Sequence, residues 1–334
     1  MSEQPDGAAR VWAMAHLGTP MALRVAATLR VADHIADGSD APWLIAAQAG
    51  ADADALDRLM RFLAARGVLL REGAGRYSLT PLGEALRDDH PSGLRRMLDI
   101  DTAVGRAELA FVQLLHSVRT GEAGYPLQFG RSFWADMAAE TERADSFDTW
   151  MSSSMPQRAP AIVAAYDWGS LGHLVDVGGG DGTLMIELLK AYRDLCGTVL
   201  DAPSAAATAR RALTAAGLDA RSGAVPGSFF DPLPAGAGGY LLSFILHDWP
   251  DEAAIAILRR CAEAAGSTGK VFVVEDTGPD GRSPHSGMDL RMLVHLGGKE
   301  RDLDALTKLA AEAGLRVRQV HPAGSLSIAE LGAK

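Results

Sequence analysis

Cysteine is almost absent from this chain, which has only Cys196 and Cys261 among its 334 residues. The two form no Cys-x-x-Cys pair, so no disulfide framework is indicated. Cys261 stands among helix-forming residues and Cys196 directly precedes an apolar run, and we expect both thiols to be buried.

Long apolar runs are also absent. No run approaches the ~20 residues that a helix needs to cross a bilayer. Residues 1–10 are polar and lack the apolar stretch of a signal peptide. We therefore expect no membrane partner, and the reducing cytoplasm is the expected location.

Positive charge is in deficit. Lys and Arg number 32 against 42 Asp and Glu, which gives a net charge of −10. No basic cluster is longer than a pair such as Arg210–Arg211, and an acidic chain repels a phosphate backbone. We expect no nucleic-acid partner. The 48% of hydrophobic residues is enough for a sizeable core, and the length fits two domains.

The first part of the chain has a helical pattern that contains one hairpin. Apolar residues recur at helical spacing between residues 23 and 35 and again over residues 52–66. Residues 67–70 and 76–79 flank a glycine-rich turn, which predicts a β-hairpin. Thr80 and Pro81 then form a typical helix start. Helix, helix, hairpin and helix together describe a winged-helix shape.

A winged helix can bind DNA or serve as a dimerisation module. The helix that would enter a DNA groove begins with Asp52, Asp54 and Asp57. These acidic side chains oppose contact with phosphates. We therefore favour dimerisation over DNA binding for this region.

Residues 101–165 are again helical, with a break near residues 121–130, and they are rich in aromatic residues and methionine. Such residues commonly pack between helices, but methionine also lines adaptable apolar pockets. The stretch directly precedes the region described next, so we expect part of it to face a substrate. The candidates are Trp150, Met151 and Met155.

From residue 172 onward, apolar runs alternate with helical segments. This alternation predicts βαβ units and a parallel sheet covered on both faces, and hence an α/β fold. The expected strands are residues 174–177, 198–200, 240–246 and 271–274. After a helix over residues 303–313, strands at 316–320 and 325–329 are expected to form an antiparallel hairpin at the sheet edge.

A glycine-rich turn follows the first of these strands and opens a helix, in the sequence Val-Asp-Val-Gly-Gly-Gly-Asp-Gly-Thr of residues 175–183. Glycines such as Gly178 and Gly180 let the backbone approach a ligand closely. A dinucleotide site would need glycine where Thr183 stands. Asp176 would repel a pyrophosphate, but it suits the sulfonium and ammonium groups of S-adenosylmethionine.

A second acidic residue, Asp201, directly follows the next expected strand. It lies 25 positions beyond Asp176, near the ~20 expected for a carboxylate that binds ribose hydroxyls. Asp201 could equally cap the helix that starts at Pro203. The two roles are compatible.

Residues 175–183 resemble motif I of the class I S-adenosylmethionine-dependent methyltransferases. The whole chain resembles the plant caffeate-type and actinomycete small-molecule O-methyltransferases, and within them the enzymes that methylate aromatic polyketide acids, such as naphthoate and orsellinate units of antibiotics. The resemblance implies a Rossmann-like catalytic domain over residues 166–334, a winged-helix dimerisation domain over residues 1–100, and linking helices over residues 101–165 that contribute to the acceptor pocket. It also implies a homodimer that uses S-adenosylmethionine and releases S-adenosylhomocysteine.

Two further motifs match this family, Leu-His-Asp-Trp-Pro-Asp-Glu at residues 246–252 and Gly-Gly-Lys-Glu-Arg at residues 297–301. The resemblance implies that His247 is the general base, that Glu300 orients it, and that Glu275 is a further catalytic acid. The chemistry agrees, because a phenol with a pKa of ~10 is mostly protonated at neutral pH, and a base with a pKa of ~6.5 can take its proton during the attack. Taken singly, His247 could also cap a helix, and Glu300 could pair with Lys299 at the surface.

The resemblance also places residues around the two ligands. Ser228 and Phe229 stand in the segment that contacts adenine in the family, where an acidic residue is frequent. Ser243 stands where plant members have lysine near the sulfonium. Met292 and His295 stand where the family lines its acceptor pocket.

No metal is expected, because no third ligand is spaced to join His247 and Asp248. Other chemistries stay open at this point. An N-methyltransferase needs the same alignment of donor and acceptor, and some methyltransferase folds catalyse decarboxylation or hydroxylation instead. The sequence does not identify the acceptor.

Overall fold

The computed structural model describes residues 6–277 and 285–334, and it divides the chain into two compact units, Met1–Leu109 and Ala110–Lys334. The three-part division expected at residues 100 and 165 stays a prediction. Within the described ranges, no helix has both the length and the apolar character needed to cross a membrane.

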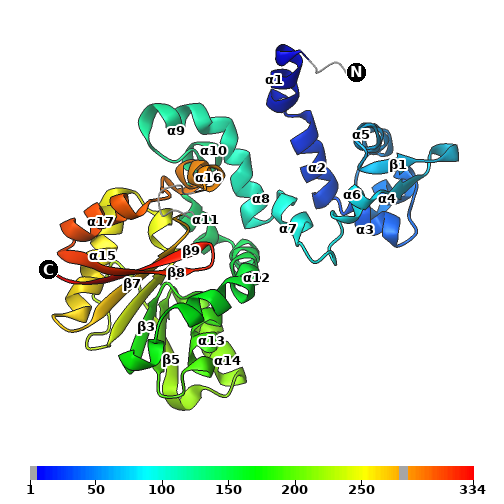
Figure 1. Ribbon diagram of the computed structural model, residues 1–334. Helices are drawn as coiled ribbons and strands as arrows, with labels where there is room; N and C mark the ends of the chain where they lie inside the picture. Colours follow the sequence, from blue (N-terminus) through cyan, green and yellow to red (C-terminus); the bar gives the residue numbers. More distant parts are fainter. Residues whose placement is uncertain (1–5, 278–284) are drawn as a thin grey trace, which may run out of the picture. The chain divides into compact units, whose positions relative to one another are not determined.

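The first unit is mainly helical and contains one hairpin (Figure 1). α5 (Ala53–Ala65) begins after Asp52, whose carboxylate accepts a backbone N–H of the first turn and so caps the helix. β1 (Leu69–Arg71) and β2 (Tyr77–Leu79) pair antiparallel, and Thr80 caps the helix that follows. The expected hairpin and helix start are therefore confirmed. The other elements are α1 (Gly7–Ala15), α2 (Gly18–Thr28), α3 (Val31–Ala36), α4 (Pro42–Ala49), the 3₁₀ turn η1 (Gly73–Gly75), α6 (Pro81–Glu84), α7 (Leu94–Leu98) and α8 (Ala103–Glu108).

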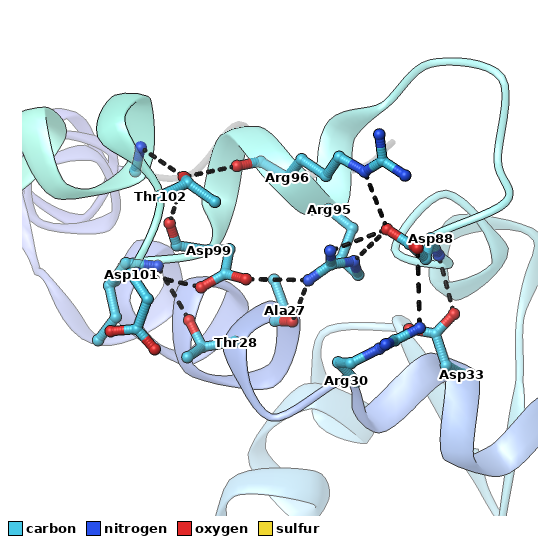
Figure 2. Close-up of polar contacts among 12 residues, drawn as sticks. Ala27, Thr28, Arg30, Asp33, Asp88, Arg95, Arg96, Asp99, Asp101 and Thr102 are labelled. Carbon is cyan, nitrogen blue, oxygen red and sulfur yellow. Dashed lines mark hydrogen bonds and ion pairs between the residues drawn. The ribbon is translucent and has the colours of Figure 1, made fainter. Parts of the chain in front are cut away.

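A polar cluster fixes α7 to neighbouring segments of this unit (Figure 2). Arg95 is only 9% exposed. Its guanidinium donates to Asp88 at 2.9 Å, to Asp99 at 3.0 Å and to the Ala27 carbonyl in α2 at 3.3 Å. A hydrogen bond from Arg96, together with the contacts from Arg95, lowers the pKa of Asp88 to about 2. The buried guanidinium is thus neutralised on both sides, as a buried charge must be.

The second unit is built on a seven-stranded sheet of order β5-β4-β3-β6-β7-β9-β8. The first five strands in this order are parallel, and β9 and β8 form an antiparallel hairpin against β7. The chain runs outward from β3 to β5 and then returns to the other side of β3 as β6. Ligands of such sheets bind at the carboxyl ends of the strands beside this reversal. The strands are β3 (His173–Val177), β4 (Cys196–Asp201), β5 (Ser222–Pro226), β6 (Gly239–Ser243), β7 (Lys270–Glu275), β8 (Leu315–Ala323) and β9 (Leu326–Ala333).

Helices cover both faces of the sheet (Figure 1). Alternate residues of β3 point to opposite faces: Leu174 packs with α12, α13 and α14, whereas Val175 and Val177 pack with α15 and α17. Both apolar layers therefore fix the end of β3 from which the glycine-rich turn emerges. The helices and 3₁₀ turns of this unit are η2 (Leu109–Gln113), α9 (Leu114–Thr120), α10 (Tyr125–Phe129), α11 (Phe133–Ala139), α12 (Thr141–Ala165), η3 (Trp168–Leu171), α13 (Thr183–Ala191), α14 (Pro203–Ala215), η4 (Asp219–Arg221), η5 (Leu246–Asp248), α15 (Asp251–Ala265), α16 (Ser286–Leu296) and α17 (Leu303–Glu312).

The structure corrects three details of the sequence analysis. The edge strand β5 was not predicted, because its Ser-Gly-Ala-Val-Pro sequence lacks a strand pattern. The strand expected over residues 240–246 ends at Ser243, because Phe244 adopts a left-handed backbone conformation with φ of 57°. Cys196 is exposed, because it begins β4 at the outer end of the strand, whereas Cys261 is buried as expected.

Candidate active site

The glycine-rich turn connects β3 to α13 and lies against the chain that leaves β6. Gly178 has a φ of 80°, and a Cβ atom added there would come within 2.4 Å of the Ile245 side chain. Only glycine combines this conformation with such close packing. The turn is thereby held next to the segment that leads to His247.

Asp176 is the most deeply buried acid of this region. It precedes the turn in β3, is 1% exposed, and its Oδ1 atom has no hydrogen-bond partner among the described residues. Burial, with repulsion by Asp201 and Asp181, raises the pKa of Asp176 to about 7. An unpartnered buried carboxylate is costly, so this position favours a cationic ligand that supplies the missing partner.

Asp201 holds two loops together at the end of β4. Its Oδ2 atom accepts the Gly180 backbone N–H at 2.8 Å, and its Oδ1 atom accepts that of Ala202 at 2.6 Å. The N-cap residue of α14 is Ala202 and has no side-chain cap bond, so Asp201 does not cap that helix in the usual way. Burial raises the pKa of Asp201, while the two N–H bonds oppose the rise.

These residues surround one cavity of about 660 Å³, within the usual size of small-molecule sites. Its wall includes an aromatic group in which the Phe230 and Trp249 rings meet edge-on with centroids 4.9 Å apart. The Trp134 ring lies nearly parallel to that of Trp249, with centroids 6.3 Å apart. The structure brings all seven predicted cofactor-binding residues to this cavity: Asp176, Gly178, Gly180, Asp201, Ser228, Phe229 and Ser243.

The three predicted catalytic residues also come together, although they are far apart in sequence. His247 lies in η5, and its Nδ1 atom is 2.8 Å from Glu300 Oε1 and 3.5 Å from Glu275 Oε2. Its Nε2 atom is 3.5 Å from Asp248 Oδ1. Glu275 Oε1 also accepts the backbone N–H groups of Leu246 and His247, at 3.0 and 3.3 Å. One imidazole thus faces three carboxylates, with its Nδ1 side anchored by Glu300.

Burial and the neighbouring charges shift the pKa values of His247 and Glu275. Burial alone would lower the pKa of His247, but the carboxylates of Glu275, Asp248 and Glu300 raise it above the ordinary value. Burial raises the pKa of Glu275 to about 7, and the opposing effect of His247 is smaller. Strongly perturbed pKa values of this kind are typical of sites of acid–base chemistry.

Arg301 fixes the backbone on both sides of His247. This residue is 6% exposed, and its guanidinium donates to the carbonyls of Leu246 and Trp249, each at 2.7 Å, and to that of Lys299 at 3.2 Å. It also forms an ion pair with Asp251 at 2.7 Å. The planar guanidinium thus joins the loop of His247 to the loop of Glu300.

The same two loops touch through their backbones. A Cβ atom added to Gly298 would lie 2.1 Å from the His247 carbonyl oxygen, so this position requires glycine. The Lys299 backbone N–H donates to the same carbonyl at 2.8 Å, and Asp289 accepts the Glu300 backbone N–H at 2.9 Å. The distance between the imidazole and its carboxylate is therefore set by the backbone as well as by the side chains.

The five predicted acceptor-pocket residues do not meet in one cavity. Met151 and Met155 of α12 line the 660 Å³ cavity, whereas Trp150 of the same helix does not. Met292 and His295 are 9% and 8% exposed on α16, which packs against η5 and hence near His247. Their contribution to acceptor binding stays a prediction.

His247, Glu275 and Glu300 could also serve as metal ligands, because one ligand atom of each lies within 4.8 Å of the others. The argument that no third ligand can join this region is wrong, because the fold supplies Glu275 and Glu300 from distant segments. Nδ1 of His247 is nevertheless engaged by Glu300. The absence of a metal stays a prediction.

Sequence reasoning missed Asp148 and Trp134, which both line the cavity. Asp148 lies on α12 at the i−3 and i−7 positions of Met151 and Met155, so the helical spacing could have identified it. Ser152, on the same helix, donates to Asp181 of the glycine-rich turn at 2.7 Å. The α12 helix is thereby attached to the cofactor loop.

A Rossmann-like sheet with a glycine-rich, acid-lined cavity and an adjacent His–Glu pair defines an S-adenosylmethionine-dependent methyltransferase. The chain belongs to the O-methyltransferase family, because the O-methyltransferase domain model matches residues 111–316 and the O-methyltransferase dimerisation domain model matches residues 13–89. The fold class, the enzyme class and the cofactor expected from the sequence are confirmed.

Individual relatives are similar over nearly the whole chain. The 2,7-dihydroxy-5-methyl-1-naphthoate 7-O-methyltransferase of Streptomyces carzinostaticus is 56% identical and covers 96% of both proteins. A crystal structure of an O-methyltransferase from neocarzinostatin biosynthesis, in complex with S-adenosylmethionine and 2-hydroxy-5-methyl naphthoic acid, has a TM-score of 0.92 at 56% identity and covers 96% of this chain and 98% of that one. The aclacinomycin 10-hydroxylase of Streptomyces purpurascens is 41% identical, over 94% of this chain and 86% of that protein.

Proposed function

We propose that this enzyme methylates a phenolic hydroxyl group of a hydroxynaphthoate-like aromatic acid in antibiotic biosynthesis. The observation that carries the proposal is the His247–Glu300 pair beside the acid-lined cavity. The substrate class is suggested by the relative of 56% identity, which is named for a dihydroxynaphthoate, and by the solved relative that contains a naphthoic acid.

In the proposed mechanism, His247 is the general base. Glu300 accepts the proton on Nδ1 at 2.8 Å, which leaves the lone pair on Nε2 for the acceptor hydroxyl. When bound, S-adenosylmethionine would supply an activated methyl group, with the neutral thioether S-adenosylhomocysteine as the leaving group. The hydroxyl oxygen forms the new bond to carbon while its proton passes to Nε2. Glu275 holds the backbone of His247 and, with Glu300, stabilises the imidazolium that results.

The residues that line the cavity fit S-adenosylmethionine, independently of the relatives. The unpartnered Asp176 Oδ1 atom offers a partner for a cation, and Asp201 lies at the end of the adjacent strand, where a ribose is expected. We assign Gly178 and Gly180 to close backbone approach, and Phe229 with Ser228 to the adenine end. Ser243 is assigned to the sulfonium end, where it lines the cavity.

The proposed function is tested by incubation of the pure protein with S-adenosylmethionine and a panel of hydroxynaphthoates, hydroxybenzoates, flavonoids and aryl amines. Mass spectrometry should show a gain of one methyl group on a hydroxynaphthoate, with one equivalent of S-adenosylhomocysteine. Methylation of the aryl amines alone would contradict O-methylation. A product that gains oxygen would indicate hydroxylation, as the name of the 41% identical relative implies for that protein. A product that loses carbon dioxide would indicate decarboxylation. Either result would contradict the proposal.

We also propose a homodimer formed through the N-terminal region, where the dimerisation model matches. α1 buries none of its residues, and Val11, Trp12, Met14 and Leu17 are between 64% and 86% exposed. Large apolar side chains that are this exposed over a short segment are typical of an interface. Light scattering should give twice the chain mass of 35.1 kDa, and a monomeric mass at micromolar concentration would contradict the proposal.

A further inference from the structure

The cavity carries an unusual balance of charge. Five aspartates line it: Asp148 from α12, Asp176 from β3, Asp181 from the glycine-rich turn, Asp201 from β4 and Asp248 from η5. Within residues 6–277 and 285–334, no lysine, arginine or histidine lines the same cavity. His247 lies behind the wall, with its Nε2 atom 3.5 Å from Asp248 Oδ1, so the other four carboxylates have no described cationic side chain in the cavity wall, and a cationic ligand suits them.

The five carboxylates differ in the partners that the protein gives them. Asp201 accepts two backbone N–H groups, and Asp181 accepts the Ser152 hydroxyl and a backbone N–H. The carboxylate of Asp148 has no hydrogen bond or ion pair with any described residue, although its side chain is half-buried in the cavity wall. Asp176 presents the unpartnered Oδ1 atom noted above. Asp148 and Asp176 are thus available to a cation.

We propose that Asp148 is a specificity-determining residue that favours the cationic methyl donor over the neutral-sulfur product. The proposal rests on the proposed function, because it takes the cavity to be the cofactor site. S-adenosylmethionine and S-adenosylhomocysteine share adenosine, ammonium and carboxylate groups and differ by one methyl group and one positive charge at sulfur. A nearby carboxylate without a protein partner acts on that difference, because its interaction with the rest of the ligand is common to both.

The consequence for turnover is direct. Methyl transfer removes one positive charge that the carboxylates attract, so Asp148 stabilises the bound product less than the bound donor. Asp148 therefore favours exchange of product for fresh donor. Charge recognition of this kind needs no direct hydrogen bond, because the attraction between opposite charges extends over several ångströms.

The raised pKa values of Asp148 and Asp176 agree with a role for these carboxylates in binding a cation. Burial, with repulsion by Asp201, Asp145 and Asp181, raises the pKa of Asp148 to about 6, and Asp176 is raised to about 7. A bound cation favours the charged form of both carboxylates and lowers their pKa values. Donor binding near pH 6.5 should therefore release protons, and donor affinity should rise with pH across this range.

The test is calorimetry of the purified protein with S-adenosylmethionine and with S-adenosylhomocysteine, in Asp148→Asn and in the wild type. The dissociation constant of the donor should rise about tenfold in the variant, and that of the product less than about threefold. Glu142→Gln is the matched control, because it makes the same charge change six residues away on α12, and Glu142 is exposed and does not line the cavity. It should change either constant less than about twofold.

Equal losses for donor and product in Asp148→Asn would overturn the proposal, because a merely structural residue would affect both ligands alike. If that variant fails to fold, Asp148→Ser carries the same comparison of donor with product, and proton release by the wild type adds a second measurement. Titrations at pH 6.5 in buffers of different ionisation enthalpy should show more protons released by donor than by product, and equal release would overturn the proposal. A wild type that binds neither ligand would instead refute the assignment of the cavity itself.

Discussion

Replacement of His247 by alanine should reduce turnover by about 10²–10⁴-fold, the usual contribution of a general base. The affinity for S-adenosylmethionine should change by less than about twofold, because His247 does not line the donor cavity. Steady-state kinetics on a methylated substrate and calorimetry with the donor measure the two effects separately. The loss should appear in kcat, because the proton transfer belongs to the chemical step.

A control is needed because the variant leaves three carboxylates without their imidazole. Thermal unfolding of His247→Ala should show that the protein still folds. His173→Ala removes a histidine at the opposite end of the sheet, where its Nε2 atom lies 2.9 Å from the Thr198 hydroxyl, and it should retain wild-type turnover. Undiminished turnover in His247→Ala would remove His247 from the mechanism.

The pH dependence of the wild type identifies the base independently. Because the surrounding carboxylates raise the pKa of His247, the imidazole keeps its proton up to a pH above the ordinary ~6.5. Only the neutral form can accept the hydroxyl proton, so kcat/KM should rise with pH and level off once His247 is deprotonated. Glu300→Gln removes one of the negative charges and should move this rise to lower pH.

Much of the fold could be predicted from the sequence, because its apolar residues recur with the spacing of helices and strands. β3 is a short apolar run followed by a well-defined helix, and β7 is one preceded by a well-defined helix. The two strands of the hairpin in the first unit flank a glycine-rich turn. β5 was missed because a short edge strand with glycine and proline owes its pairing to β4 and not to its own propensity. The left-handed Phe244 has no sequence signal, and it is a tertiary feature that turns the chain toward His247.

Some residues of the site could likewise be predicted from the sequence, and others could not. The glycine-rich turn and the two short motifs are each continuous in sequence. Asp176 is assigned from its place before the turn, Asp201 from its spacing to Asp176, and His247 and Glu300 from the family resemblance of their motifs. Asp148 belongs to no motif and reaches the cavity only through the packing of α12. Arg301 could be recognised only as a neighbour of Glu300, because its partners are backbone carbonyls from a loop about 50 residues earlier, as in its bond to Leu246. Because every residue has a backbone carbonyl, a hydrogen bond to a carbonyl cannot be predicted from the type of the accepting residue.

Asp201→Ala should weaken donor binding more than any other change in the cavity. The substitution removes the carboxylate assigned to the ribose and also the two bonds that hold Gly180 and Ala202. Hydrogen bonds to a charged group contribute about 1.5–3 kcal/mol each, so the dissociation constant of S-adenosylmethionine should rise on the order of 10²-fold. Calorimetry measures this change directly. Asp194→Ala, an exposed site before β4, should leave the constant unchanged.

The pattern of the loss separates Asp201 from Asp148. The ribose is common to donor and product, so Asp201→Ala should weaken S-adenosylmethionine and S-adenosylhomocysteine by the same factor. Asp148→Asn should weaken the donor selectively, because only the donor carries the sulfonium charge. A selective loss in Asp201→Ala would mean that Asp201 acts on the sulfonium through its charge and not on the ribose. Unchanged binding of both ligands would remove Asp201 from the cofactor site and leave it only the role of joining the two loops.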